Sequence, residues 1–215
     1  MAPLLCIIGA ARGDSPGAAL TSGIHEMRFF VALSLPDPLR WQLRLLCGGL
    51  PGARWVPPEN FHITLRFLGD VDGRDMDYVD AALASIRAPG FRLRLAGVGH
   101  FASGNRVKAV WAGVEKEPAL LHLHDKIESA VVRAGLPPDG QKYTPHVTLT
   151  WPKDPPIAKL QEYLAGHNLF RSEAFEVTHF TLFSSLPGSE NSVYHAERSY
   201  ALTARPEPSV QNAGR

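Results

Sequence analysis

The sequence predicts an α+β fold with two lobes, in which an internal duplication produces two mainly antiparallel sheets that face a central cleft, with helices on the outside. A short motif, His-x-Thr-Leu, occurs at residues 62–65 and again at residues 146–149. Each copy lies in an alternating run rich in β-branched residues, which is typical of a half-buried strand. Helical and strand-like segments also follow one another in a similar order in the two halves.

The first half opens with a strand and a helix. Residues 28–35 form an apolar run bounded by Pro36, which is typical of a central strand. Asp37 at an N-cap and Pro38 at the first helical position predict that a helix follows at once. Its leucines recur at helical spacing, and we expect the glycine pair at residues 48–49 to end it.

The first motif strand follows a loop rich in Pro and Gly and ends at Gly69. A second helix is predicted over residues 74–87. Two strands come next: residues 91–97, where arginines alternate with apolar residues, and residues 107–114, which are centred on Trp111. A polar turn lies between these two strands.

The second half repeats this order. Residues 118–133 form the clearest amphipathic helix, and we expect Gly135 to cap it. The second motif strand follows another turn rich in Pro and Gly, and a helix is predicted from residue 154 to residue 166. A closing pair of strands is predicted over residues 175–184 and 194–202. Each half therefore carries one motif strand.

Both ends of the chain are expected to lie outside the fold. Residues 1–26 lack helical periodicity, and their apolar stretch has no basic residue ahead of it. We interpret them as a disordered extension, with a cleaved targeting peptide as the alternative. Residues 27–204 form the predicted domain, and residues 205–215 form a frayed tail.

The composition excludes several classes of function. Lys and Arg number 22 against 21 Asp and Glu, a formal net charge of +1, so a polyanion must be bound by a local basic groove. Two cysteines supply neither a disulfide framework nor a Cys-x-x-Cys metal site. No apolar run reaches the roughly 20 residues that span a bilayer. We expect a monomeric cytoplasmic protein.

The motif places an imidazole and a hydroxyl together. Strand alternation sets His62 beside Thr64, and His146 beside Thr148, opposite the apolar residues of each motif. Because the ordinary pKa of histidine is about 6.5, one copy can accept a proton while the other donates one.

Opposed strands would set the two histidines on either side of a phosphate, with the threonines donating to its oxygens. No carboxylate cluster adjoins either motif, which favours chemistry without a metal ion. One motif alone would be explained as well by a half-buried strand with its histidine on the polar face, so it is the duplication that favours a catalytic site.

The two motifs, the segment from Arg54 to His62, its continuation from Arg66 to Gly69 and the opening strand resemble the two-histidine phosphoesterase superfamily. Within it they are most similar to the RNA 2′,3′-cyclic phosphodiesterases, also called 2′-5′ RNA ligases. The resemblance implies a bilobal fold that hydrolyses 2′,3′-cyclic phosphate ends of RNA, or of small nucleotides, to 2′-phosphates. It implies no metal or other cofactor, and reversible 2′-5′ RNA ligation as a further activity. It further implies that His62 protonates the leaving 3′ oxygen and His146 activates water.

Other residues are candidates for binding the substrate. Arg66 is predicted to share the strand face of the first motif and to reach the phosphate, with a solvated arginine as the alternative. Lys142, four residues before the second histidine, is predicted to bind phosphate although the family usually has arginine there. Tyr143, Phe101 and Trp151 could stack on a base, with core packing as the alternative, which is preferred for Trp151.

Two positions depart from the family pattern, because Trp151 and Ser184 stand where many members have arginine. Alternation places Trp151 on the apolar face of the second motif strand, where we expect core packing. The missing arginines leave two alternatives open: a nucleotide- or RNA-binding module with weak or no turnover, and a phosphodiesterase for another small cyclic or 2′-5′-linked nucleotide.

Overall fold

The computed structural model describes residues 27–104, 106–188 and 191–205. The predicted N-terminal extension and residues 206–215 of the predicted tail lie outside them. The helical elements are α1 (Asp37–Leu45), η1 (Pro58–Asn60), α2 (Gly73–Ala84), α3 (Pro118–Arg133) and α4 (Ile157–His167). The strands are β1 (Arg28–Ser34), β2 (Ala53–Trp55), β3 (His62–Gly69), β4 (Phe91–Leu93), β5 (Leu95–Ser103), β6 (Arg106–Val114), β7 (His146–Pro152), β8 (Phe175–Val177), β9 (His179–Leu186) and β10 (Val193–Ala201).

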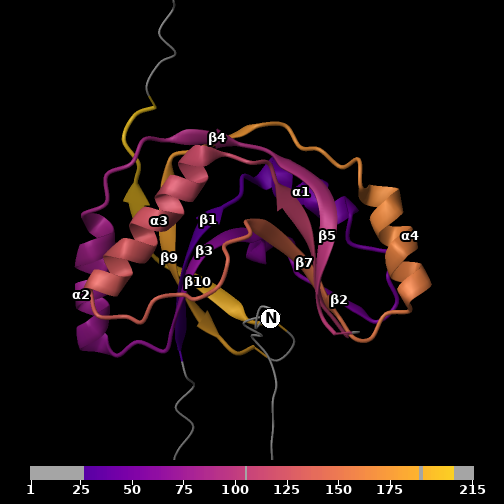
Figure 1. Ribbon diagram of the computed structural model, residues 1–215, viewed down its shortest axis with the longest axis horizontal. Helices are drawn as coiled ribbons and strands as arrows, with labels where there is room; N and C mark the ends of the chain where they lie inside the picture. Colours follow the sequence, from indigo (N-terminus) through magenta and orange to yellow (C-terminus); the bar gives the residue numbers. More distant parts are fainter. Residues whose placement is uncertain (1–26, 105, 189–190, 206–215) are drawn as a thin grey trace, which may run out of the picture.

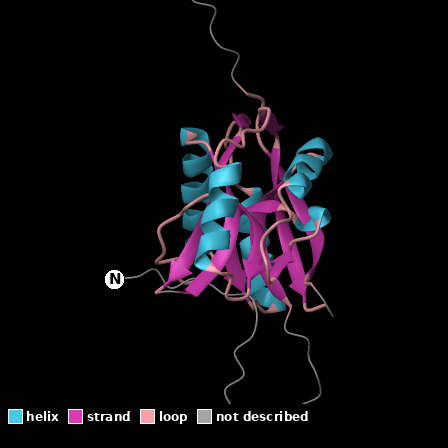
Figure 2. Ribbon diagram, turned by 90° about the vertical axis from the view of Figure 1, so that its right-hand side faces the viewer, coloured by secondary structure: helices cyan, strands magenta, loops and turns pink. Residues whose placement is uncertain are grey.

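Two four-stranded sheets form the centre of the described residues, in the orders β10-β9-β1-β3 and β2-β7-β6-β5. Every pairing between their strands is antiparallel. Figure 1 shows α2 and α3 beside the first sheet and α4 beside the second, and Figure 2 shows helices on both sides of the strands. The predicted α+β class is confirmed, with one motif strand in each sheet.

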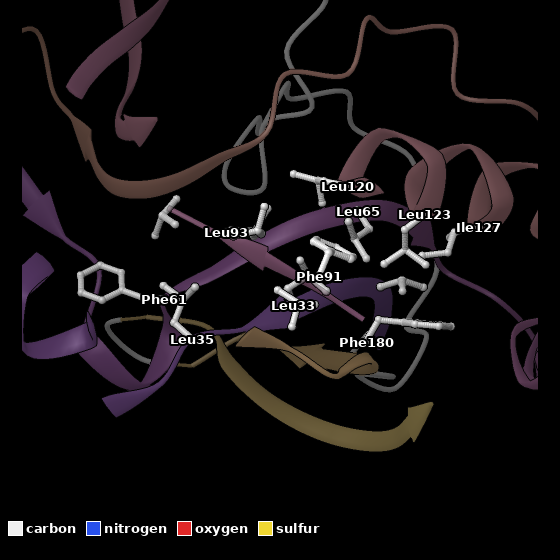
Figure 3. Packing of buried hydrophobic residues seen from close by; sticks show 14 of the residues in the cluster. Leu33, Leu35, Phe61, Leu65, Phe91, Leu93, Leu120, Leu123, Ile127 and Phe180 are labelled. Atoms are coloured by element: carbon white, nitrogen blue, oxygen red, sulfur yellow. The ribbon is translucent and has the colours of Figure 1, made fainter. Parts of the chain in front are cut away.

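One apolar core holds α1, α2 and α3 against the sheets, and a second, smaller cluster holds α4. On α3, buried Leu120, Leu123 and Ile127 recur at helical spacing, so one face of the helix turns inward. Figure 3 shows these side chains beside Leu65 of β3, in the cluster that also contains Phe180 of β9. Burying one such side chain stabilises the fold by about 1.5–3 kcal/mol. The core lies behind the motif strands and supports them.

Three short strands depart from the sequence prediction. The segments predicted as single strands over residues 91–97 and 175–184 each divide in two, because β4 and β8 pair with each other in a separate two-stranded sheet. The Pro- and Gly-rich segment predicted as a loop contains β2, which pairs with β7. No helix in the described ranges is long and apolar enough to cross a membrane.

A β-bulge follows the threonine of the first motif and changes which side chains share a face. Thr64 pairs with Ala32 of β1. Arg66, two residues further on, pairs with Val31, the neighbour of Ala32, so β3 contains one extra residue. Paired residues point to the same face, and neighbours on β1 point to opposite faces. The prediction that Arg66 shares the face of the first histidine is therefore wrong.

The second motif has a bulge at the equivalent place. Thr148 pairs with Trp111 of β6, whereas Thr150 pairs with Val110, the neighbour of Trp111. Thr150 therefore lies on the face opposite Thr148, and Trp151 returns to the face of Thr148. Trp151 is 39% exposed, so the prediction that it packs in the core is wrong.

Candidate active site

The two predicted catalytic histidines open the two motif strands. His62 is the first residue of β3 and His146 is the first residue of β7. The two strands lie side by side near the centre of the molecule (Figure 1). The pKa of His62 is lowered mainly by burial and to a smaller degree by the positive charge of protonated His146, as expected for two rings near each other on contacting strands. We call the sheet faces that carry these rings the histidine faces.

The same hydrogen bond orients both imidazoles. Nδ1 of His62 lies 2.7 Å from the carbonyl oxygen of Asn60, and Nδ1 of His146 lies 2.7 Å from the carbonyl oxygen of Thr144. A carbonyl oxygen can only accept, so Nδ1 carries the proton in both rings. Nε2 is therefore the nitrogen that each ring offers to a substrate, as an acceptor when neutral and as a donor when protonated.

Aromatic rings enclose His62. Phe30 of β1 lies 4.9 Å from its ring, centroid to centroid, and Tyr194 of β10 meets it edge-on at 5.4 Å. Burial lowers the pKa of His62 from 6.5 to about 4, against the Asn60 hydrogen bond, which raises it. His62 is therefore neutral near pH 7.

His146 has equivalent aromatic neighbours. Phe101 of β5 meets its ring edge-on at a centroid distance of 4.9 Å, and Trp111 lies at 6.1 Å. Gly99 makes room for the indole, because a Cβ atom at residue 99 would lie 2.3 Å from the ring of Trp111. Burial lowers the pKa of His146 below 6.5, while the Thr144 hydrogen bond raises it.

The predicted threonines share the histidine faces. Thr64 follows His62 by two residues on β3, and Thr148 follows His146 by two on β7, each ahead of its bulge. Both are half-buried. In the described part of the chain, neither hydroxyl has a hydrogen-bond partner, so both can donate to a phosphate oxygen.

The guanidinium of Arg66 is bound by other groups of the protein and does not face the histidines. Its Nε atom donates to Glu128 Oε2 of α3 at 2.5 Å, and its Nη2 atom donates to the carbonyl of Pro137 at 2.5 Å. Nη1 donates to the carbonyl of Phe67, and the side chain is only 9% exposed. The prediction that Arg66 binds the phosphate is corrected accordingly, because the arginine fastens β3 to α3 and to the loop that follows it.

Tyr143, predicted as a base contact, links the two motif strands. Its hydroxyl donates to the backbone carbonyl of Thr64 at 3.2 Å, and its ring stacks on His124 of α3 at a centroid distance of 3.9 Å. Burial raises the pKa of Tyr143. The residue that precedes the second motif thus contacts the first motif directly.

Replacing Tyr143 with Phe removes this hydrogen bond and keeps the stacking ring. We expect the free energy of unfolding to fall by about 1 kcal/mol and KM for an RNA substrate to stay unchanged. Urea titration and steady-state kinetics measure both quantities. A higher KM with unchanged stability would instead favour a substrate contact by the hydroxyl.

Two further predicted residues lie near the site. Phe101 packs against His146, as described above, and is half-buried. Lys142 is exposed in the segment that leads into β7. Lys142 forms no ion pair with an acidic side chain within the described ranges. No group of three or more His, Cys, Asp or Glu side chains in these ranges could hold a metal ion.

Three aromatic neighbours of the histidines and both of their carbonyl partners lie beyond what the local sequence predicts. Phe30, Trp111 and Tyr194 reach the histidines from β1, β6 and β10 through strand pairing, which local sequence does not reveal. Asn60 and Thr144 were recognisable only by position, because each stands two residues before a histidine. The Asn60 side chain also donates to the Ser192 carbonyl at 2.9 Å, which anchors it.

Comparison with known proteins agrees with this geometry. Residues 40–188 match the 2′-5′ RNA ligase superfamily. An RNA 2′,3′-cyclic phosphodiesterase of Aeropyrum pernix is 40% identical over 102 residues, 47% of this chain and a little over half, 57%, of the relative. The enzyme of that name from Archaeoglobus fulgidus is 28% identical over 176 residues, 78% of this chain and 96% of the relative.

A solved structure shares the fold. The crystal structure of E. coli LigT complexed with 3′-AMP has a TM-score of 0.67 and 27% identity, covering 82% of this chain and 98% of that one. The superfamily match includes both motif strands and the bulges that follow them. The chain therefore belongs to the 2′-5′ RNA ligase superfamily.

Proposed function

We propose that this protein hydrolyses the 2′,3′-cyclic phosphate end of RNA to a 2′-phosphomonoester, with two histidines as acid and base and without a metal ion. The observation that carries the proposal is the duplicated geometry. Both imidazoles have Nδ1 bound to the carbonyl two residues earlier, and both have a threonine ahead of a bulge on the same face. Names of relatives in the superfamily support this substrate.

The reaction is an in-line displacement at phosphorus. Neutral His146 accepts a proton at Nε2 from water, whose oxygen forms the new bond to phosphorus. The bond between phosphorus and the 3′ oxygen breaks, and protonated His62 donates its Nε2 proton to that oxygen. Proton transfers of this kind contribute about 10²–10⁴-fold each. The product carries a 2′-phosphate and a 3′-hydroxyl. When a 5′ hydroxyl takes the place of water, the same displacement forms a 2′-5′ phosphodiester and again releases the 3′ hydroxyl.

The remaining residues stabilise the phosphate. The hydroxyls of Thr64 and Thr148 donate to its non-bridging oxygens as negative charge develops. Lys142 supplies a positive charge from the mobile end of a long side chain, without the paired donors of an arginine. Phe101, beside His146, offers a ring to the terminal base. We further propose that the protein acts as a monomer, because one chain supplies both histidines, and in the cytoplasm, because its two cysteines supply no disulfide framework.

The low pKa of His62 makes substrate binding part of the mechanism. With a pKa of about 4, His62 is almost entirely deprotonated in the free enzyme near pH 7. A bound phosphate places negative charge beside the ring and favours its protonated form, by about 1–3 pKa units for a close opposite charge. The substrate therefore helps to create the acid that cleaves it.

The pH dependence of kcat/KM follows from these shifts. This parameter reports the free enzyme, in which the pKa values of both histidines lie below 6.5. We expect kcat/KM to be greatest below pH 6.5 and to fall above it, as the free enzyme loses the proton that the acid must carry. The kcat profile should lie at higher pH, because bound phosphate raises the pKa of His62. A kcat/KM maximum above pH 7 would contradict this account.

The activity itself is tested with an RNA that ends in a 2′,3′-cyclic phosphate, with EDTA present. We expect a 2′-phosphate product and undiminished turnover. Loss of turnover with EDTA, restored by a divalent ion, would contradict the metal-free mechanism. Binding without turnover would favour an RNA-binding module, and faster turnover of a 2′-5′-linked or other cyclic nucleotide would favour a different phosphodiesterase.

A further inference from the structure

An exposed tryptophan extends the histidine face of the second sheet. The bulge on β7 turns Trp151 to the face of Thr148, and its pairing partner on β2 confirms this orientation. Trp151 pairs with Arg54, whereas the next residue, Trp55, packs on Tyr163 of α4 on the opposite face. Trp151 remains 39% exposed. The site thus continues along β7 beyond the threonine.

Arg54 adds a positive charge beside this indole. Paired residues in antiparallel strands have Cβ atoms about 4.5–5.5 Å apart, so Arg54 and Trp151 are neighbours on one face. Arg54 is exposed, and no ion pair or hydrogen bond occupies its guanidinium in the described ranges. By contrast, Arg66, the arginine that follows the first motif, has all its donor groups bound within the protein.

Trp151 and Arg54 lie at a distance from Thr148 that suits a second nucleotide. With a rise of about 3.3 Å per residue, Trp151 lies about 7–10 Å along β7 from Thr148, which in the proposed function holds the cyclic phosphate. The indole ring of Trp151 can stack on a base, and the guanidinium of Arg54 can pair with the phosphate attached to the same nucleotide. A mononucleotide 2′,3′-cyclic phosphate has one phosphate, which the threonines bind, and so offers nothing to Arg54. A longer RNA end offers a phosphodiester immediately upstream.

We infer that Trp151 and Arg54 form a subsite for the nucleotide on the 5′ side of the terminal one: its base stacks on Trp151, and the phosphodiester that joins the two nucleotides pairs with Arg54. The inference rests on the proposed function and narrows its substrate class to RNA ends of two or more nucleotides. Stacking accepts any base, so the subsite selects for length rather than for sequence.

The test compares adenosine 2′,3′-cyclic phosphate with the dinucleotide ApA that ends in the same group. We expect the wild type to favour the dinucleotide in kcat/KM. Trp151→Ala should lower kcat/KM for the dinucleotide about 5- to 140-fold, the effect of losing one stacked base, and change the mononucleotide value less than twofold. Trp151→Phe should retain most of the preference. A dinucleotide whose 5′ unit lacks a base should be insensitive to Trp151→Ala.

Arg54→Gln should also lower kcat/KM for the dinucleotide alone and weaken its dependence on salt. Trp41→Ala and Arg74→Gln are matched controls, because Trp41 is 67% exposed on α1 and Arg74 is exposed on α2; neither should alter the preference. Equal losses on both substrates, or no loss on either, would overturn the subsite and leave the proposed function intact. Failure of the wild type to hydrolyse either substrate would instead overturn the proposed function. Thermal melting of each variant establishes that it is folded.

Discussion

Alanine at His62 or at His146 is expected to lower kcat for a 2′,3′-cyclic phosphate RNA by about 10²–10⁴-fold. In the proposed mechanism, each substitution removes one of two proton transfers that occur in the same displacement, so either loss alone is severe. The fold should survive both, because the imidazoles are half-buried on the histidine faces and lie apart from the core behind the strands. Steady-state kinetics with chelator present, together with thermal melting, measure the two effects.

The double variant distinguishes a concerted pair from two independent contributions. Groups that act as a unit give losses that do not add, so the variant that lacks both histidines should lose little more than the worse single variant. His100, exposed on β5, provides a control histidine whose replacement by Ala should leave kcat unchanged. Wild-type turnover in either single variant would exclude the two-histidine mechanism.

The second large effect concerns stability. Arg66→Ala is expected to lower the free energy of unfolding by about 3 kcal/mol, because it leaves the Glu128 carboxylate partly buried without its partner. The pair has side-chain exposures of 9% and 22%, so solvent screens it only weakly. The carbonyl of Pro137 also loses its donor. Chemical denaturation measures the change.

The Arg66→Ala variant also tests whether Arg66 has a structural role or binds the phosphate, as the sequence predicts. If Arg66 fastens β3 to α3, the folded variant should keep kcat/KM within about threefold of the wild type at a temperature where it is fully folded. Arg66→Ala combined with Glu128→Gln should recover part of the lost stability, since no unpaired charge remains. A stable variant with a much higher KM would show that Arg66 binds substrate instead.

Alternation of side chains was enough to predict which motif side chains share a face, because the two motifs lie before their bulges. His62 and Thr64 are two residues apart on β3, with no irregularity between them, so the periodicity of a strand applies directly. The helix over residues 118–133 could be predicted equally well, since its apolar spacing and Pro118 are local signals. These features depend on neighbours in the sequence alone.

The errors at Arg66 and Trp151 have one physical origin. A bulge depends on how a strand pairs with its neighbour, and after it the alternation is reversed. Both residues follow a bulge, so both were assigned to the wrong face. Strand β2 was missed for a related reason, because three residues in a Pro- and Gly-rich segment become a strand only through pairing with β7.

The central claim is that His62 acts as the acid and His146 as the base. The most direct test uses an RNA whose cyclic phosphate is joined to sulfur in place of the 3′ oxygen. A thiol ionises with a pKa near 8.5, so a thiolate leaves without a general acid. We predict that His62→Ala hydrolyses this substrate within about tenfold of the wild-type rate, while His146→Ala stays as impaired as on the oxygen substrate. Rescue of His146→Ala instead, or rescue of neither variant, would contradict the assignment of His62 as the proton donor.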